Sequence, residues 1–215
     1  MLLGQITLNI SLVLYSFFYL PQLLYNIRYR RYADLSFYFH ALLLLAATAD
    51  LFYGFGRITQ WQYRWISLLM FVCLMIQHGQ LLRASASGCK RRRQLLGLTS
   101  IVLCLLGLLV WCLLQASVHQ RLFVIMGWLE RLGYSFYALP QWLKNHKQGS
   151  VQALSPWFLL LALVTAICDT ISAWCFSWGP SSLYGAPVTV FFSLLLFCQW
   201  LIAYFYPKNS RCCDV

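Results

Sequence analysis

The segment LPQLLYN at Leu20–Asn26 recurs 119 residues later as LPQWLKN at Leu139–Asn145. The match extends without a gap over Tyr15–Asp50 and Tyr134–Asp169, where 15 of 36 aligned pairs are identical. Leucine inflates such a count in an apolar chain, but the shared Pro-Gln, Asn and Asp are not leucines. The chain therefore contains two copies of one unit.

The composition indicates an integral membrane protein. Of 215 residues, 61% are apolar and only 10% are charged, and the mean hydropathy is +0.67. A soluble domain needs more charge to cover its surface. Each span of a bilayer takes about twenty apolar residues. Seven such runs are present, at 2–23, 35–56, 62–82, 95–115, 121–142, 155–177 and 184–206. We expect an all-α membrane bundle.

The basic residues predict the orientation. Twelve lie in one alternate set of loops and three in the other, and the richer side normally faces the cytosol. We therefore expect an outside or lumenal N-terminus and a cytosolic C-terminus. The net charge of +11 then reflects topology, and no nucleic-acid partner is expected. The richer set is Arg28, Arg30, Arg31, Arg83, Lys90, Arg91, Arg92, Arg93, Lys144, Lys147, Lys208 and Arg211, and the poorer set is Arg57, Arg64 and Arg121.

Each copy contains three spans, and the fourth span matches neither copy. Because three is an odd number of spans, two directly joined copies would have opposite orientations in the membrane. The fourth span gives both copies the same orientation. This predicts a three-plus-one-plus-three bundle with a pseudo-two-fold axis along the membrane normal. We expect a first bundle at 1–83, a basic loop and linker helix at 84–117, and a second bundle at 118–215. The oligomeric state stays open.

Pro21 and Pro140 lie near the ends of the first and fifth spans. Proline removes a backbone donor and clashes with the preceding turn, so a kink is expected at each. Gln22 and Gln141 are candidates to satisfy the freed carbonyls. The pair acts either as hinges of a moving gate or as ordinary helix ends. Ser36 and Ser155 are expected to cap the helices that follow.

Asp50 and Asp169 each lie fourteen residues beyond their cap, or about 21 Å along a helix. That depth puts both carboxyl groups inside the membrane, where such groups usually mark a substrate or proton path. Thr165 shares the helix face of Asp169. The alternative is a pair of structural hydrogen bonds without a transport role.

Further polar residues lie within the spans. Gln80 and Gln199 are equivalent at the offset of 119 and either contact substrate or bond a neighbouring helix. Gln77 and His78 lie nearby. Glu130 and its neighbour Arg131 have no counterpart in the first copy. Because adjacent helical residues point about 100° apart, we expect them not to pair with each other, and one of them is a candidate to line the cavity.

No nucleophile elbow, phosphate loop or metal-ligand cluster is recognisable. The sequence therefore predicts neither an enzyme nor a metal or cofactor, apart from a proton as coupling ion.

The doubled Pro-Gln, followed by Asn26 or Asn145 at +5 and Leu-Ser at +14 and +15, resembles the PQ-loop family. The run from Ile76-Gln77-His78 to Leu81-Leu82-Arg83 resembles the ending of third and seventh helices in that family, and this favours Gln77 as the partner of Gln199. The resemblance implies a SWEET-like fold with a central site and alternating access. Family members include cystinosin, cationic amino-acid exporters, SWEET sugar carriers and the related KDEL receptors.

The resulting functional hypothesis is a proton-coupled carrier of a small polar solute, most readily a cystine-type or cationic amino acid. The alternatives are a SWEET-type facilitator of sugars or neutral solutes, and a KDEL-receptor-like sorting receptor. SWEETs carry an Asn on the third and seventh helices, and this chain has none there. A lysosomal or vacuolar membrane is expected in a eukaryote, and the inner membrane in a bacterium.

Overall fold

The computed structural model describes residues 2–30, 32–57, 59, 61–115, 119–148, 151–177 and 180–205. Of the basic residues counted above, Arg31, Lys208 and Arg211 lie outside these ranges. The described chain is helical, with one short 3-10 turn, η1 (Tyr32–Asp34). The helices are α1 (Leu2–Phe18), α2 (Leu20–Tyr29), α3 (Phe37–Gly56), α4 (Trp61–Ala84), α5 (Lys90–Leu114), α6 (Gln120–Phe136), α7 (Ala138–Gln148), α8 (Pro156–Cys175) and α9 (Pro180–Phe205).

Six helical segments in the described ranges are long and apolar enough to cross a membrane. They are α1 with α2 as one span, then α3, α4, α5, α8 and α9. The repeat pairs α1–α2 with α6–α7, so α6 and α7 together form the remaining span. That span is less apolar because it carries Glu130 and Arg131. The predicted all-α bundle of seven spans is confirmed.

Both Pro-Gln segments break their span in two. α1 ends at Phe18 and α2 begins at Leu20, and the matching break between α6 and α7 falls at Tyr137. Each break lies two or three residues before the proline, in the turn whose hydrogen bond the proline cannot make. Each helix is therefore interrupted next to its proline, at the place where a kink was expected, in both copies.

The two predicted helix caps differ. The Ser36 hydroxyl accepts from the backbone N–H of Phe39 and caps α3 as expected. Ser155 occupies the corresponding position before α8, but its side chain makes no capping bond, so the prediction is wrong for that hydroxyl. Pro156 already removes one free N–H from the first turn of α8.

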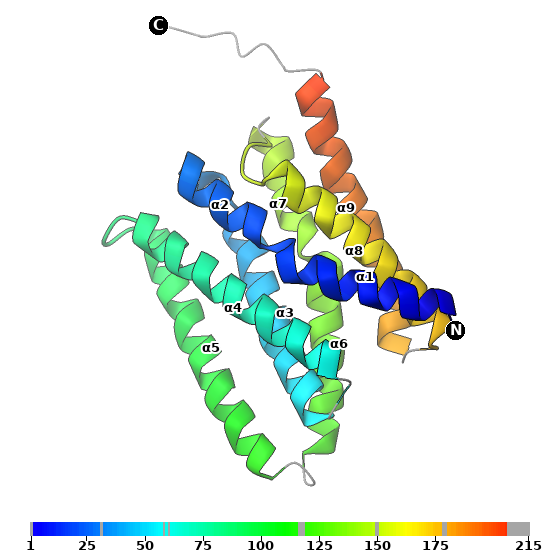
Figure 1. Cartoon of the computed structure of the whole chain (residues 1–215). Coiled ribbons are helices and arrows are strands. Elements are labelled where there is room, and N and C mark those ends of the chain that lie inside the picture. Colours follow the sequence, from blue (N-terminus) through cyan, green and yellow to red (C-terminus); the bar gives the residue numbers. More distant parts are fainter. Residues whose placement is uncertain are drawn as a thin grey trace, which may run out of the picture.

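The two copies pack against each other through equivalent helices. The most extensive contacts between copies join α3 to α6 and α1 to α8, and the offset of 119 converts one pair into the other. α5 packs chiefly on α3 and α4, so it extends the first copy to one side (Figure 1). The two copies therefore share extensive interfaces, and the buried apolar core continues from them between α3, α4 and α5.

The α3–α6 interface depends on close approach at Gly133. A Cβ added there would lie 2.7 Å from the Cβ of Ala46, an atom fixed to the backbone of α3. At Gly107 on α5 nothing lies within 4 Å of an added Cβ. The two glycines thus give a matched pair of substitutions.

We expect Gly133→Ala to destabilise the protein by about 1–3 kcal/mol through overpacking, and Gly107→Ala to leave stability equal or higher. Thermal melting in detergent or nanodiscs measures both. Adding Ala46→Gly to Gly133→Ala should restore the melting temperature. An unchanged melting temperature for Gly133→Ala alone contradicts the packing described.

Candidate functional site: a charged cavity between the repeats

The Pro-Gln glutamine of the first copy reaches into the second. The Gln22 side chain is fully buried. Its N–H groups donate to Asn26 Oδ1 at 2.8 Å and to the Ala153 carbonyl at 3.2 Å, and its oxygen accepts from the backbone N–H of Ser155 at 2.8 Å. Asn26 in turn donates to Gln80 Oε1 at 3.1 Å. A side chain of α2 thereby satisfies the free N-terminus of α8.

The second copy repeats this arrangement atom for atom. Gln141 donates to Asn145 Oδ1 at 2.7 Å and to the Asp34 carbonyl at 3.3 Å, and accepts from the Ser36 backbone N–H at 2.7 Å. Asn145 donates to Gln199 Oε1 at 3.0 Å. Each copy therefore completes the helix start of the other copy.

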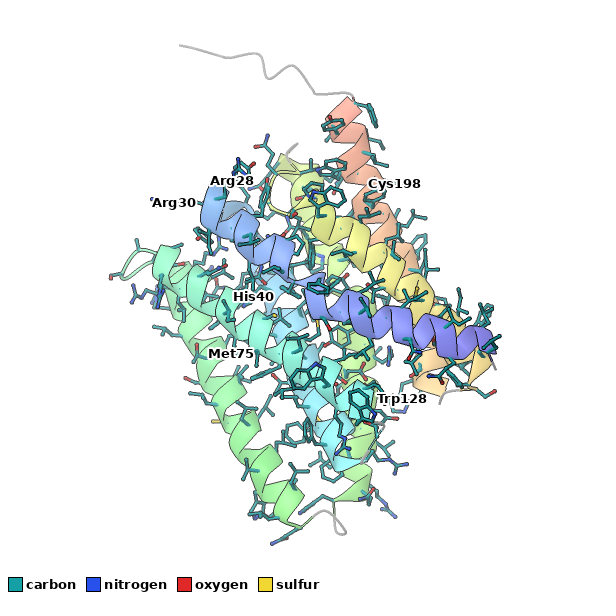
Figure 2. All side chains as sticks on the ribbon, viewed as in Figure 1. Arg28, Arg30, His40, Met75, Trp128 and Cys198 are labelled. Carbon is teal, nitrogen blue, oxygen red and sulfur yellow. The ribbon has the colours of Figure 1, made fainter. Side chains whose placement is uncertain are left out.

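These bonds assign the predicted amides. Gln80 and Gln199 take the same part in the two networks, so Gln80, and not Gln77, is the equivalent of Gln199. The networks lie at the end of the bundle that contains α2, α7 and the loop between α4 and α5. We call this the motif end, and Arg28 and Arg30 at the end of α2 mark it in Figure 2. In the conformation described, the two copies are joined there.

A cavity of about 340 Å³ lies between the copies, further from the motif end. Thr59 and Ser182, in and beside the loops of the opposite end, belong to its lining, so the cavity extends toward that end. Its polar lining is Tyr15, Asp50, Tyr53, Thr59, Tyr63, Glu130, Arg131, Tyr134, Tyr137, Asp169, Ser182 and Thr189. Three carboxyl groups thus face one guanidinium.

Asp169 on α8 is held by hydroxyl groups of α1. Ser11 Oγ donates to Oδ1 at 2.8 Å, and the Tyr15 hydroxyl donates to Oδ2 at 2.6 Å. Both carboxylate oxygens therefore have a donor from the opposite copy. Ser172, one turn further along α8, bonds the Thr7 hydroxyl at 2.7 Å instead of Asp169.

Asp50 has different surroundings from its repeat partner. The hydroxyl of Tyr63 on α4 donates to Asp50 Oδ1. Ser11, which donates to Asp169, is equivalent to Glu130 at the offset of 119. The position that supplies a hydroxyl to Asp169 therefore carries a carboxyl group in the other copy. The two acidic sites of the cavity are thus chemically distinct.

Arg131 gives the cavity its positive charge. Its Nη2 lies 3.3 Å from Glu130 Oε1, so the expectation that these neighbours do not pair is wrong. The backbone positions do diverge by about 100°, but the long arginine side chain turns back. The absence of a side chain at Gly185 on α9 makes room for the Arg131 side chain, because an added Cβ there would lie 2.3 Å from Arg131 Cγ. Arg131 Nε is buried and has no hydrogen-bond partner among the described residues.

Other predicted site residues lie elsewhere. The hydroxyl of Thr165 donates to the Leu161 carbonyl in its own helix. Gln77 and His78 are buried in the first copy and are not part of the cavity lining. The tyrosines of the lining were not singled out by sequence reasoning. Tyr15 and Tyr134 are identical at the offset of 119, and that match was the one available signal.

Seven membrane spans, two parallel repeats and an ionisable cavity between the repeats define the architecture of a membrane transporter. The PQ loop repeat family matches the chain twice, at residues 3–63 and 122–182, which are again 119 residues apart. The chain belongs to the PQ-loop family, and this membership supports a membrane transporter of small solutes.

A solved structure of a eukaryotic SWEET transporter has the same fold. It superposes with a TM-score of 0.67 over 97% of this chain and 100% of that chain, at 14% sequence identity. No curated protein sequence matches the chain.

Removing one motif glutamine should weaken the closed motif end. Gln22→Leu leaves the Ser155 N–H and the Ala153 carbonyl without their partner, which costs about 1–3 kcal/mol. Spin labels at the exposed Tyr29 and Lys147 report the separation of α2 and α7, and we expect a larger separation in the variant. Gln5→Leu is the control, because Gln5 is exposed and, among the described residues, its side chain bonds only Asn9 of the same helix. Equal distances for both variants contradict this role for Gln22.

Proposed function

We propose that the protein is a proton-coupled carrier of a small amino-acid-type solute, with the motif end facing the cytosol. The observation that carries this proposal is the single cavity containing Asp50, Glu130, Asp169 and Arg131. The orientation rests on the excess of Lys and Arg at the motif end. The cavity volume of about 340 Å³ suits a metabolite and not a folded partner.

Arg131 is the group we propose for a substrate carboxylate. A guanidinium offers a planar fork of donors that fits a carboxylate with two parallel hydrogen bonds. Arg131 uses one nitrogen on Glu130 at 3.3 Å, and its buried Nε has no partner among the described residues. Donor capacity therefore remains available toward the cavity.

The three acids supply the complementary charge. If all were ionised, they would exceed Arg131 by two negative charges in a membrane-embedded site, where unbalanced charge is costly. A cationic solute, bound protons or both remove that excess. We propose that Asp169, held by two hydroxyl donors, receives the substrate ammonium, and that the carboxyl groups of Asp50 and Glu130 exchange the proton.

A second candidate is a receptor that binds a peptide terminus and does not release it across the membrane. The strong charge of the cavity favours this candidate too, because an Arg131–carboxylate contact suits a peptide C-terminus equally well. A facilitator of sugars or neutral solutes has less support, because such solutes do not balance three acids.

Uptake by proteoliposomes tests the proposal. Labelled amino acids and sugars are offered with and without an inward proton gradient, and we expect gradient-driven accumulation of an amino acid, most strongly a cationic one. Asp50→Asn should abolish accumulation while exchange at equal pH persists. Asp34→Asn is the matched control, because Asp34 lies outside the cavity lining. Binding without uptake moves the assignment to the receptor, and pH-independent sugar uptake moves it to the facilitator.

The carboxylate contact has its own test. Arg131→Lys keeps the charge but loses the planar fork. We expect the preference for an amino acid over the amine that lacks its carboxyl group to fall at least about tenfold, or about 1.4 kcal/mol. Competition binding to purified protein measures this ratio, and melting temperature controls for folding. An unchanged ratio would remove Arg131 from the substrate site.

A further inference from the structure

A second buried polar cluster lies inside the first copy, outside the charged cavity. His40 on α3 and His78 on α4 are 0% and 2% exposed. His40 Nε2 lies 3.0 Å from His78 Nδ1, and His78 Nε2 lies 2.8 Å from the Thr99 hydroxyl on α5. His40 lies in the interior, where α4 crosses α3 in the view of Figure 2. The chain of bonds joins three helices.

The hydroxyl of Thr99 decides which ring nitrogens carry protons. We assign its one proton to the Leu95 carbonyl, 3.1 Å away, and with this assignment the oxygen accepts from His78 Nε2–H at 2.8 Å. A neutral imidazole has a single N–H, and His78 Nδ1 is therefore an acceptor. It follows that His40 donates through Nε2–H, and that His40 Nδ1 holds a lone pair.

That lone pair is buried and has no hydrogen-bond partner among the described residues. Beside it lies the Gln77 side chain, which is fully buried and whose amide nitrogen and oxygen both lack a partner in the described part of the chain. Buried polar atoms without partners are rare and normally have a specific cause. An amide can donate to neutral His40 or, after turning, accept from a protonated His40.

We propose that His40 and His78 form a second proton-binding site, in which one proton enters at His40 Nδ1 and is held by Gln77 Oε1. The resulting imidazolium donates through Nδ1–H to Gln77 and through Nε2–H to His78. Two of the three atoms without a partner in the neutral cluster, His40 Nδ1 and Gln77 Oε1, then bond each other in the protonated one. The pair takes up one proton for two rings, because His78 Nδ1 stays an acceptor.

The site belongs to one copy only. The offset of 119 converts His40 into Leu159 and His78 into Phe197. Besides His78 and Gln77, the Arg91 guanidinium of α5 acts on His40, and as a cation it opposes a proton there, whereas the Gln77 side chain favours one. Arg91 and Lys144 both bond the Leu35 carbonyl near the start of α3, and Asp34 lies close to both cations.

The position of the pair suggests what the proton does. His40 lies one turn beyond Ser36, whose N–H is bound by Gln141, and Gln77 lies one turn before Gln80 of the motif network. The pair is closed to water while the motif end is joined, so proton exchange requires that end to open. A cation is costly in a dry bundle. Proton binding therefore favours the conformation open at the motif end, a role that rests on the proposed transport function.

Nitrogen NMR of the histidine-labelled, full-length protein in nanodiscs tests the site without any transport assay. We expect both rings to be Nε2-protonated in the neutral form, and one ring in the pair to become imidazolium as the pH falls. His40→Leu and His78→Phe assign the signals, because they install the residues of the second copy. An Nδ1–H tautomer in either ring, two protons bound by the pair, or none while the protein remains folded would overturn the proposal.

Transport tests the proposed role separately. Acidifying the motif-end side, with the pH difference across the membrane held constant, should slow uptake, by at most about tenfold per pH unit for one proton. The double variant His40→Leu/His78→Phe should lose this inhibition and keep substrate binding, and His146→Leu, at an exposed site on α7, should behave as wild type. Inhibition that persists in the double variant rejects the role. If the NMR spectra of the wild-type protein are as expected but no solute is transported, the carrier proposal is overturned and the proton-site proposal is not.

Discussion

Two buried glutamines hold this molecule together at one end. Each completes the helix start of the opposite repeat and also bonds the asparagine of its own motif, so its donors and acceptor are used at once. A buried amide that loses one partner leaves several groups unsatisfied. These bonds therefore fix the position of each Pro-Gln helix relative to the helix start of the other copy and to the third helix of its own copy. They also close the cavity on the side of the motif end.

Away from the symmetric networks of the motif end, the two copies differ. The repeat offers one carboxyl group from each copy, yet Ser11 and Tyr15 donate to Asp169, whereas Glu130 occupies the position equivalent to Ser11 in the second copy. The histidine pair is likewise confined to the first copy. The repeat thus supplies the glutamine networks and one aspartate from each copy, and Glu130, Arg131 and the histidine pair make the two copies chemically different.

The sequence was sufficient for the spans, the repeat and the helix break at each Pro-Gln segment, because each follows from local periodicity or from matched spacing. It was not sufficient for contacts that depend on side-chain reach. Glu130 and Arg131 form an ion pair although their backbone positions point about 100° apart. The Ser155 hydroxyl does not cap α8 although Ser155 lies at the N-cap position. His40 meets His78 across 38 residues of chain, and no single-sequence pattern indicates that two such helices face each other at that height.

The reciprocal glutamine exchange has a consequence for assembly. Each repeat offers its partner the same donor, the same acceptor and the same helix start that it requires in return, so the contact is self-complementary in the manner of a two-fold dimer interface. A single repeat on its own has the means to pair with an identical copy. Covalent linkage through α5 then fixes the stoichiometry at one copy of each, and this frees each half to accumulate residues that a homodimer would have to carry twice.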